Sequence, residues 1–191
     1  MKIFITGATG FIGSNLVKQL LKNNHEVICY VRNVEKARRK LGNKVELIGT
    51  TIFQNHMIKT LERCDAVVNL AGEPIVKRWT KSNKKKIYDS RIDVTTKLIK
   101  AIESCNTPPK VLISSSAVGF YGNRGDETLT ESSDGSSGWL SHLCSQWEKA
   151  SYPSHLERTI PTRVVNLRTG IVLGNGGALK KMLLPFKMGL G

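Results

Sequence analysis

The stretch Met1-Lys-Ile-Phe-Ile-Thr-Gly7-Ala-Thr-Gly10-Phe-Ile-Gly13 decides the fold. An apolar run, Ile3–Ile5, leads into three glycines with the spacing G-x-x-G-x-x-G, and apolar residues at helical spacing follow. A strand, a tight turn and a helix in this order are the context that a dinucleotide-binding turn requires. Gly7 permits the turn, Gly10 permits close approach of a pyrophosphate, and Gly13 permits the helix to pack on the strand. The free N–H groups at the start of the helix would then face the anion.

Short apolar strands and amphipathic helices alternate along the rest of the chain. We expect strands at residues 2–6, 25–31, 45–48, 66–70, 111–113 and 163–167, and helices at 11–23, 35–41, 55–63, 80–104 and 140–150. Residues 122–138 are rich in Gly, Ser, Asp and Asn and predict a loop. Buried strands joined by helical crossovers predict an α/β fold, a doubly wound parallel sheet of the Rossmann type. One domain is expected over residues 1–191. It looks incomplete at its C-terminal end, because the amphipathic segment from Met182 is followed by no closing strand.

The composition fits one soluble globular domain and excludes several classes of protein. Hydrophobic residues make up 40% and charged residues 23% of the 191 residues. No apolar run is long enough for a membrane span. The first strand is expected to begin at residue 2, which leaves no room for a targeting segment, so we expect a cytosolic protein; a processed organellar protein is the alternative. The four cysteines (Cys29, Cys64, Cys105 and Cys144) form no C-x-x-C pair, and we expect reduced, packed thiols. The four histidines lack metal-ligand spacing, so we expect no metal site.

The formal net charge of +14 is partly concentrated between Lys77 and Lys86, a stretch with six cations and no acidic residue. One interpretation is a patch that attracts a phosphorylated ligand or a nucleic acid. The other, which we favour, is a solvated helix face. Nucleic-acid binders usually interleave aromatic residues with the cations, and here only Trp79 does so.

Arg32 indicates which dinucleotide the glycine turn would hold. It stands just past the second expected strand, nineteen residues after Gly13. An acidic residue at this point binds the ribose 2′-hydroxyl of NAD, whereas an arginine suits the 2′-phosphate of NADP. We therefore predict NADP rather than NAD, the alternative being a plain surface arginine. Ala71 and Gly72, after the fourth strand, are small enough for a cofactor to pass over them.

These features together resemble an extended-type short-chain dehydrogenase/reductase, within an atypical epimerase-like subfamily of the NAD-dependent epimerases and dehydratases whose substrate is unassigned. The resemblance covers nearly the whole chain. The stretches that carry it are Gly7–Gly13 (GATGFIG), Asp65–Pro74 (DAVVNLAGEP), Arg78-Trp79, Asp89–Arg91, Ser114–Gly122 (SSSAVGFYG), Trp147-Glu148, Arg168–Gly174 (RTGIVLG), Gly176–Leu179 and Leu184–Gly191. Members normally continue into a small substrate-side lobe.

The resemblance also implies the contacts to the cofactor. They fall on the glycine turn, the end of the second strand, the end of the fourth strand and the loop after the sixth. The residues are Gly7, Thr9, Gly10, Phe11, Ile12, Gly13, Val31, Arg32, Leu70, Ala71, Gly72 and Val172. Arg91, on the long helix, is expected to point toward the phosphates or ribose; the alternative is a salt bridge on the helix surface.

One departure from the superfamily pattern matters for catalysis. Typical members carry Tyr-x-x-x-Lys on the helix after the fifth strand, where the tyrosine is the acid/base and the lysine lowers its pKa. None of the four tyrosines here is followed four residues later by lysine. Counted back from Trp147-Glu148, the pair would fall near Leu140 and Cys144, and neither side chain can do this chemistry. The standard proton relay is therefore predicted to be missing.

Other residues become candidates for the acid/base. We expect Ser114–Ser116 to follow the fifth strand, where nicotinamide and substrate would meet, and Ser115, Tyr121 and Glu73 are the candidates. The alternatives are serines that satisfy backbone groups and a tyrosine that only packs. Two functions fit: an NADP-dependent oxidoreductase or epimerase-like enzyme acting on a carbonyl compound or nucleotide sugar, or an NADP-binding sensor or scaffold without turnover. A homodimer through residues 80–104 and the helix after the fifth strand is a further expectation.

Overall fold

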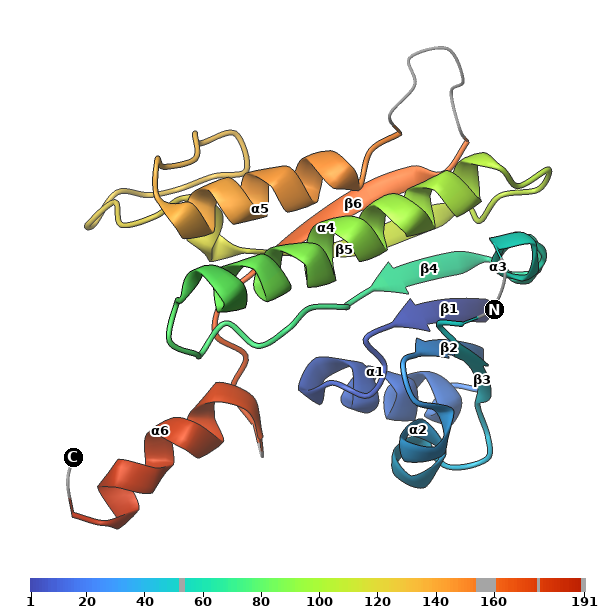
Figure 1. Ribbon diagram of the computed structural model, residues 1–191, viewed down its shortest axis with the longest axis horizontal. Helices are drawn as coiled ribbons and strands as arrows, with labels where there is room; N and C mark the ends of the chain where they lie inside the picture. Colours follow the sequence, from blue (N-terminus) through green and yellow to red (C-terminus); the bar gives the residue numbers. More distant parts are fainter. Residues whose placement is uncertain (52–53, 154–160, 175, 190–191) are drawn as a thin grey trace.

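Six parallel strands form one sheet in the computed structural model, which describes residues 1–51, 54–153, 161–174 and 176–189 (Figure 1). The strand order is β3-β2-β1-β4-β5-β6. The strands are β1 (Lys2–Thr6), β2 (Glu26–Val31), β3 (Glu46–Gly49), β4 (Ala66–Asn69), β5 (Val111–Ala117) and β6 (Arg163–Thr169). The predicted doubly wound sheet is confirmed. Chain order reverses between β1 and β4, which is the switch point where such sheets bind ligands.

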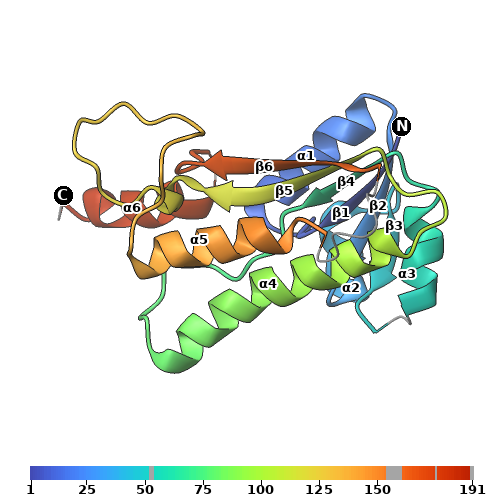
Figure 2. The same ribbon diagram turned by 90° about the horizontal axis from the view of Figure 1, so that it is seen from above.

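Helices cover both faces of the sheet (Figures 1 and 2). They are α1 (Phe11–Lys22), α2 (Val34–Leu41), α3 (Gln54–Leu61), α4 (Lys81–Glu103), α5 (Trp139–Ala150) and α6 (Gly177–Lys187), with a short 3-10 helix η1 (Val118–Phe120) after β5. Helices α1 and α2 pack on one face, and α3 and α4 pack on the other, with α5 beside α4. Of the helices in the described ranges, none is long and apolar enough to cross a membrane.

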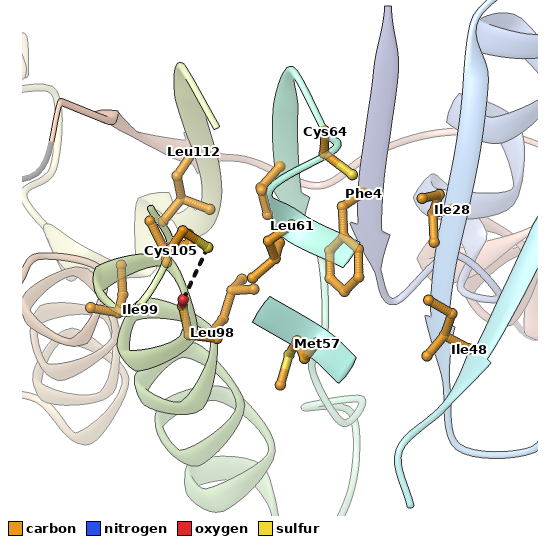
Figure 3. Close-up of a cluster of buried hydrophobic side chains, with 13 residues drawn as sticks. Phe4, Ile28, Ile48, Met57, Leu61, Cys64, Leu98, Ile99, Cys105 and Leu112 are labelled. Carbon is orange, nitrogen blue, oxygen red and sulfur yellow. Dashed lines mark hydrogen bonds between the residues drawn. The ribbon is translucent and has the colours of Figure 1, made fainter. Parts of the chain in front are cut away.

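Strand alternation divides the core between the two faces. Phe4 and Ile28 point toward α3 and α4 and meet Leu61 and Leu98 there (Figure 3). Their neighbours in sequence, such as Ile5, point to the opposite face against α1 and α2. All four cysteines are buried and free, so the predicted reduced, packed thiols are confirmed.

The structure differs from the sequence expectation at the fifth strand. We expected it to end at Ile113, but β5 continues to Ala117 because β6 pairs with it along its whole length, from Val111 to Ala117. The three serines therefore lie inside the strand and not after it. The last helix also begins earlier than the expected Met182, at Gly177.

Candidate functional site

The glycine turn between β1 and α1 is so tight that side chains are excluded from it. Gly7 has φ of +69°, and a Cβ atom there would lie 2.4 Å from the carbonyl oxygen of Leu70. A Cβ atom on Gly13 would lie 2.3 Å from the carbonyl oxygen of Gly7. Gly10, the residue before α1, has no side chain to cap the helix, so the first N–H groups of the helix stay available. A free helix N-terminus at the carboxyl edge of a parallel sheet suits a pyrophosphate.

The loop after β6 reaches back to the start of α1. A Cβ atom on Gly174, Gly176 or Gly177 would come within 2.8–2.9 Å of the Phe11 ring. Phe11, Ile12 and Val172, three of the predicted contacts, line one groove of about 890 Å³. Thr9 lies beside it, and its carbonyl oxygen accepts a hydrogen bond from Lys40 Nζ (2.7 Å). The fold thus joins residues that are far apart in sequence.

A second pocket, of about 260 Å³, opens at the ends of β1 and β2 on the α3/α4 side. It has mostly apolar walls with hydroxyl groups and two cations. Its lining residues are Thr6, Tyr30, Arg32, Thr50, Met57, Val94, Lys97 and Leu98. Of these, only Arg32 was singled out from the sequence; Val31, the predicted contact beside it, is buried in the core. The others come from five separate segments, namely β1, β2, the end of β3, α3 and α4, and no local motif marks them. A flat base with a charged neighbouring group fits such walls.

Arg32, which follows β2, lies near the carboxylate of Glu73, which follows β4 on the other side of the switch point. Its Nη1 is 3.9 Å from Oε2 of Glu73, and its side chain is 88% exposed. Because β1 lies between β2 and β4, this weak pair spans the end of β1. Glu73 also accepts a hydrogen bond from Lys77, and that bond, followed by the charges of Lys77 and Arg32, holds the pKa of Glu73 below its usual value against the opposing effect of burial. Glu73 is therefore ionised near neutral pH.

Arg91 contacts the backbone after β4, beside Ala71 and Gly72, over which the cofactor is predicted to pass. Its Nη1 donates to the carbonyl oxygens of Glu73 (3.0 Å) and Ile87 (3.1 Å), and its guanidinium lies 5.0 Å from the Trp147 ring centroid. A Cβ atom on Gly72 would lie 3.1 Å from Arg91 Cζ. Burial lowers the pKa of Arg91. Its hydrogen bonds therefore fix the backbone at Glu73, directly after Gly72, to α4.

A buried polar network fixes the ends of β1 and β4. Thr6 Oγ1 donates to Asn69 Oδ1 (2.6 Å) and accepts from the Ala71 N–H (3.2 Å). Asn69 Nδ2 donates to Thr95 Oγ1 (2.8 Å), which also accepts from Trp147 Nε1 (3.1 Å). Satisfied networks of this kind rigidify the elements they join. The backbone from Asn69 to Ala71, where the cofactor is predicted to pass, is therefore held by this network.

The serines of β5 face opposite sides of the sheet. Ser114 and Ser116 are buried toward α4 and α5, and Ser116 Oγ donates to Glu148 Oε1 on α5 (2.5 Å). Ser115, the serine singled out from the sequence, points to the other face because side chains alternate along a strand. The alternation becomes visible only once the serines are known to lie inside the strand.

Tyr121 and Arg168 belong to one cluster at the ends of β5 and β6. The buried hydroxyl of Tyr121 donates to the Thr130 carbonyl (3.0 Å) and accepts from Arg168 Nη1 (2.8 Å). Arg168 binds Glu148 through two hydrogen bonds, Nε–Oε1 of 2.8 Å and Nη2–Oε2 of 2.9 Å. Burial raises the pKa of Glu148, but the hydrogen bonds from Arg168 and Ser116 outweigh it and hold the pKa below its usual value. Glu148 and Arg168 had been noted from the sequence only as parts of motifs.

The residues at the Tyr-x-x-x-Lys positions face the segment that follows β5. A Cβ atom on Gly119 would lie 3.7 Å from Leu140 Cβ and 3.9 Å from Cys144 Sγ. Burial raises the pKa of the Cys144 thiol, outweighing a hydrogen bond with the Ala117 backbone. Leu140 and Cys144 thus present an aliphatic side chain and a thiol to this segment.

The cationic stretch at the start of α4 is partly neutralised. Lys77 pairs with Glu73, and Lys85 pairs with Asp89 (2.6 Å). Lys84 Nζ lies 5.2 Å from the centroid of a tryptophan ring at the start of α5. These contacts fit the interpretation as a solvated helix face. Among the residues that the structure describes, no three His, Cys, Asp or Glu side chains gather to hold a metal; His155 lies outside those ranges.

The doubly wound sheet and its three-glycine turn define a protein of the Rossmann class. The sequence profile of the NAD dependent epimerase/dehydratase family matches residues 3–179. The chain therefore belongs to that family.

Individual relatives place the chain more closely within the family. It is 37% identical, over 97% of its length, to an Arabidopsis thaliana protein named "Epimerase family protein SDR39U1 homolog, chloroplastic". The crystal structure of human epimerase family protein SDR39U1 with NADPH superimposes with a TM-score of 0.82 at 34% identity, covering 100% of this chain and 61% of that one. A nucleoside-diphosphate sugar epimerase from Corynebacterium glutamicum gives a TM-score of 0.76 at 32% identity, covering 98% and 38%. The chain spans 53–61% of the length of the curated relatives from Arabidopsis, Bacillus subtilis and human.

Proposed function

We propose that this chain is the NADP-binding domain of an epimerase-like oxidoreductase of the short-chain dehydrogenase/reductase superfamily. The observation that carries the proposal is the alignment of three features along the carboxyl edge of β2, β1 and β4. These are the pocket with Arg32, the glycine turn with its uncapped helix, and the backbone from Asn69 to Ala71 that the polar network holds. The NADPH in the human relative's structure supports the choice of cofactor.

Each feature has a defined task in such a site. The N–H groups at the start of α1 would bind the pyrophosphate, and Arg32 would bind the 2′-phosphate. Ala71 and Gly72 leave room for the cofactor, and Arg91 holds the carbonyl of the next residue, Glu73, in place. When bound, NADP carries a hydride at its nicotinamide ring, and the protein contributes orientation and electrostatics.

The proton that accompanies hydride transfer needs a donor or acceptor from this chain. Ser115 and Tyr121 are the proposed residues. The Tyr121 hydroxyl would have to release Thr130 or Arg168 before it could meet a substrate. The proposed substrate is a carbonyl compound or nucleotide sugar, supported by the name of the Corynebacterium relative. If activity is found and Tyr121→Phe leaves it intact, Tyr121 is not the acid.

A second function is favoured by one observation. Leu140 and Cys144 stand where the resemblance places the usual Tyr and Lys, and both lie close to Gly119. A protein that binds NADP without turnover, as a sensor or scaffold, needs no donor there. Oxidation of NADPH with a panel of carbonyl compounds and nucleotide sugars would identify the enzyme. The homodimer through α4 and α5 stays a prediction, which light scattering tests.

Nucleotide binding is the decisive test of the proposal. Dissociation constants for NADPH and NADH are measured by calorimetry for the wild type, for Arg32→Asp and for Arg39→Asp. Arg39 is an exposed arginine on α2 outside both pockets, so it controls for the change in net charge. We expect Arg32→Asp to lower the preference for NADPH about tenfold or more, because a charge-assisted contact to phosphate is lost. Failure of the wild type to bind either nucleotide would overturn the proposal.

A further inference from the structure

The pocket of about 260 Å³ that contains Arg32 has a second cation, Lys97. Lys97 on α4 lines the same pocket as Arg32, which follows β2. The two residues approach from different elements, with Tyr30 from β2 and Val94 from α4 also lining the pocket. None of the described lining residues is acidic. The pocket is therefore an electropositive site with apolar walls.

We propose that Lys97 is a second specificity-determining residue for NADP, acting with Arg32 on the phosphate next to the base. This inference rests on the proposed function, and it names the part of the site that selects the phosphorylated cofactor. Lys97 lies on α4, far along the chain from β2, so a sequence motif at the end of β2 does not include it.

Arg32 alone is poorly placed to give strong selectivity. Its side chain is 88% exposed and lies 3.9 Å from the Glu73 carboxylate, which attracts it away from a ligand. An exposed cation in high dielectric, shared with a carboxylate, discriminates weakly between a phosphate and a hydroxyl. Lys97 is also exposed, but it shares its charge with no carboxylate among the described residues, so it adds to the attraction for a phosphate.

Lys97 meets the requirements for this role. Within the described ranges it forms no ion pair, so its ammonium is available to a ligand. Side chains on a helix lean toward the helix N-terminus, and the N-terminal end of α4 lies at the carboxyl edge of the sheet (Figure 2). The neighbouring Leu98 and Val94 supply apolar wall for the base, and Lys97 supplies a positive charge to the same pocket.

The test compares nucleotide affinities of the purified chain and three variants. Lys97→Met removes the charge, Lys97→Arg keeps it, and Lys100→Met makes the same change one turn further along α4, outside both pockets. Dissociation constants for NADPH and NADH are measured at low and high salt. Melting temperatures without nucleotide show that each variant is folded.

We expect Lys97→Met to weaken NADPH about fivefold and to leave NADH unchanged, while Lys97→Arg and Lys100→Met match the wild type. The difference should shrink in about 1 M salt, where screening is strong. Equal weakening of NADPH and NADH would mean that Lys97 supports the base alone, and this result overturns the inference, as does an unchanged NADPH affinity. If the wild type binds neither nucleotide, the proposed function fails and the inference fails with it.

Discussion

Replacing Arg168 with methionine should destabilise the fold strongly, because it leaves Glu148 without its partner. The two side chains are only 20% and 13% exposed. Arg168 also donates to the Tyr121 hydroxyl and to the Glu131 carbonyl (3.1 Å), so the substitution removes bonds from β6 to α5, to the segment after η1 and to the loop beyond it. Methionine keeps the apolar contact with the Phe120 ring, which lies 3.6 Å from the guanidinium carbon.

The expected loss of unfolding free energy is about 3 kcal/mol. Removing one partner of a buried ion pair costs about 3–5 kcal/mol, and we take the lower end because the Ser116 hydroxyl still donates to Glu148. With a urea m-value of about 2 kcal/mol/M, the midpoint should fall by about 1.5 M. A double-mutant cycle with Glu148→Gln should give a coupling energy of about 2 kcal/mol.

Arg124 offers a matched control on the surface. It also binds a glutamate through two hydrogen bonds, to Glu127 at 2.7 and 2.6 Å, and a backbone carbonyl, that of Asp134, but its pair is more exposed, at 30% and 46%. Arg124→Met should leave the urea midpoint unchanged, since exposed pairs contribute little. The reasoning is refuted if Arg168→Met and Arg124→Met have the same midpoint, or if the cycle shows no coupling.

Three further substitutions test the glycine turn, the Arg32–Glu73 pair and Glu148. Gly13→Ala places a Cβ atom 2.3 Å from a backbone oxygen, so it should cost about 3 kcal/mol in urea unfolding and abolish nucleotide binding, whereas Gly138→Ala, with open space around it, should do neither. Glu73→Gln should tighten NADPH binding about threefold in calorimetry, because Arg32 is released from the carboxylate 3.9 Å away. Weaker binding would show that Glu73 does not compete with the cofactor for Arg32. Glu148 has a lower pKa folded than unfolded, so its ionisation stabilises the fold above the ordinary value of 4.5, and this contribution is lost as pH falls through the folded pKa. Glu148→Gln should therefore flatten the acid limb of the melting-temperature profile; an unchanged slope would contradict the assignment.

Local patterns in the sequence account for the part of the site that is built from one segment. The turn from β1 to α1 is determined by Gly7 and Gly13, because no residue with a side chain fits where their Cβ atoms would lie. Leu140 and Cys144 lie four residues apart on α5, so they face the same segment after β5; that they stand at the Tyr-x-x-x-Lys positions stays a prediction. These inferences needed only neighbours in the chain.

Pairing between distant segments decided the residues that the sequence misplaced. Serine has little intrinsic preference for strands, so the run Ser114–Ser116 resembled a loop, yet seven-residue pairing with β6 keeps it in β5. That pairing turns Ser116 toward Glu148 and Ser115 away from it. No propensity scale contains this information, because the hydrogen-bonding partner is supplied by β6.

The sequence by itself thus determined the sheet class and the nucleotide-binding turn, since steric exclusion at glycine and the alternation of apolar residues act over a few neighbouring positions. Only the tertiary structure decided which side chains share a pocket. Arg32 and Lys97 come together because β2 and α4 pack around the same end of the sheet, and Glu148 meets Arg168 because α5 covers the β5–β6 pair. Such encounters depend on how whole elements pack, and no spacing along the chain encodes them.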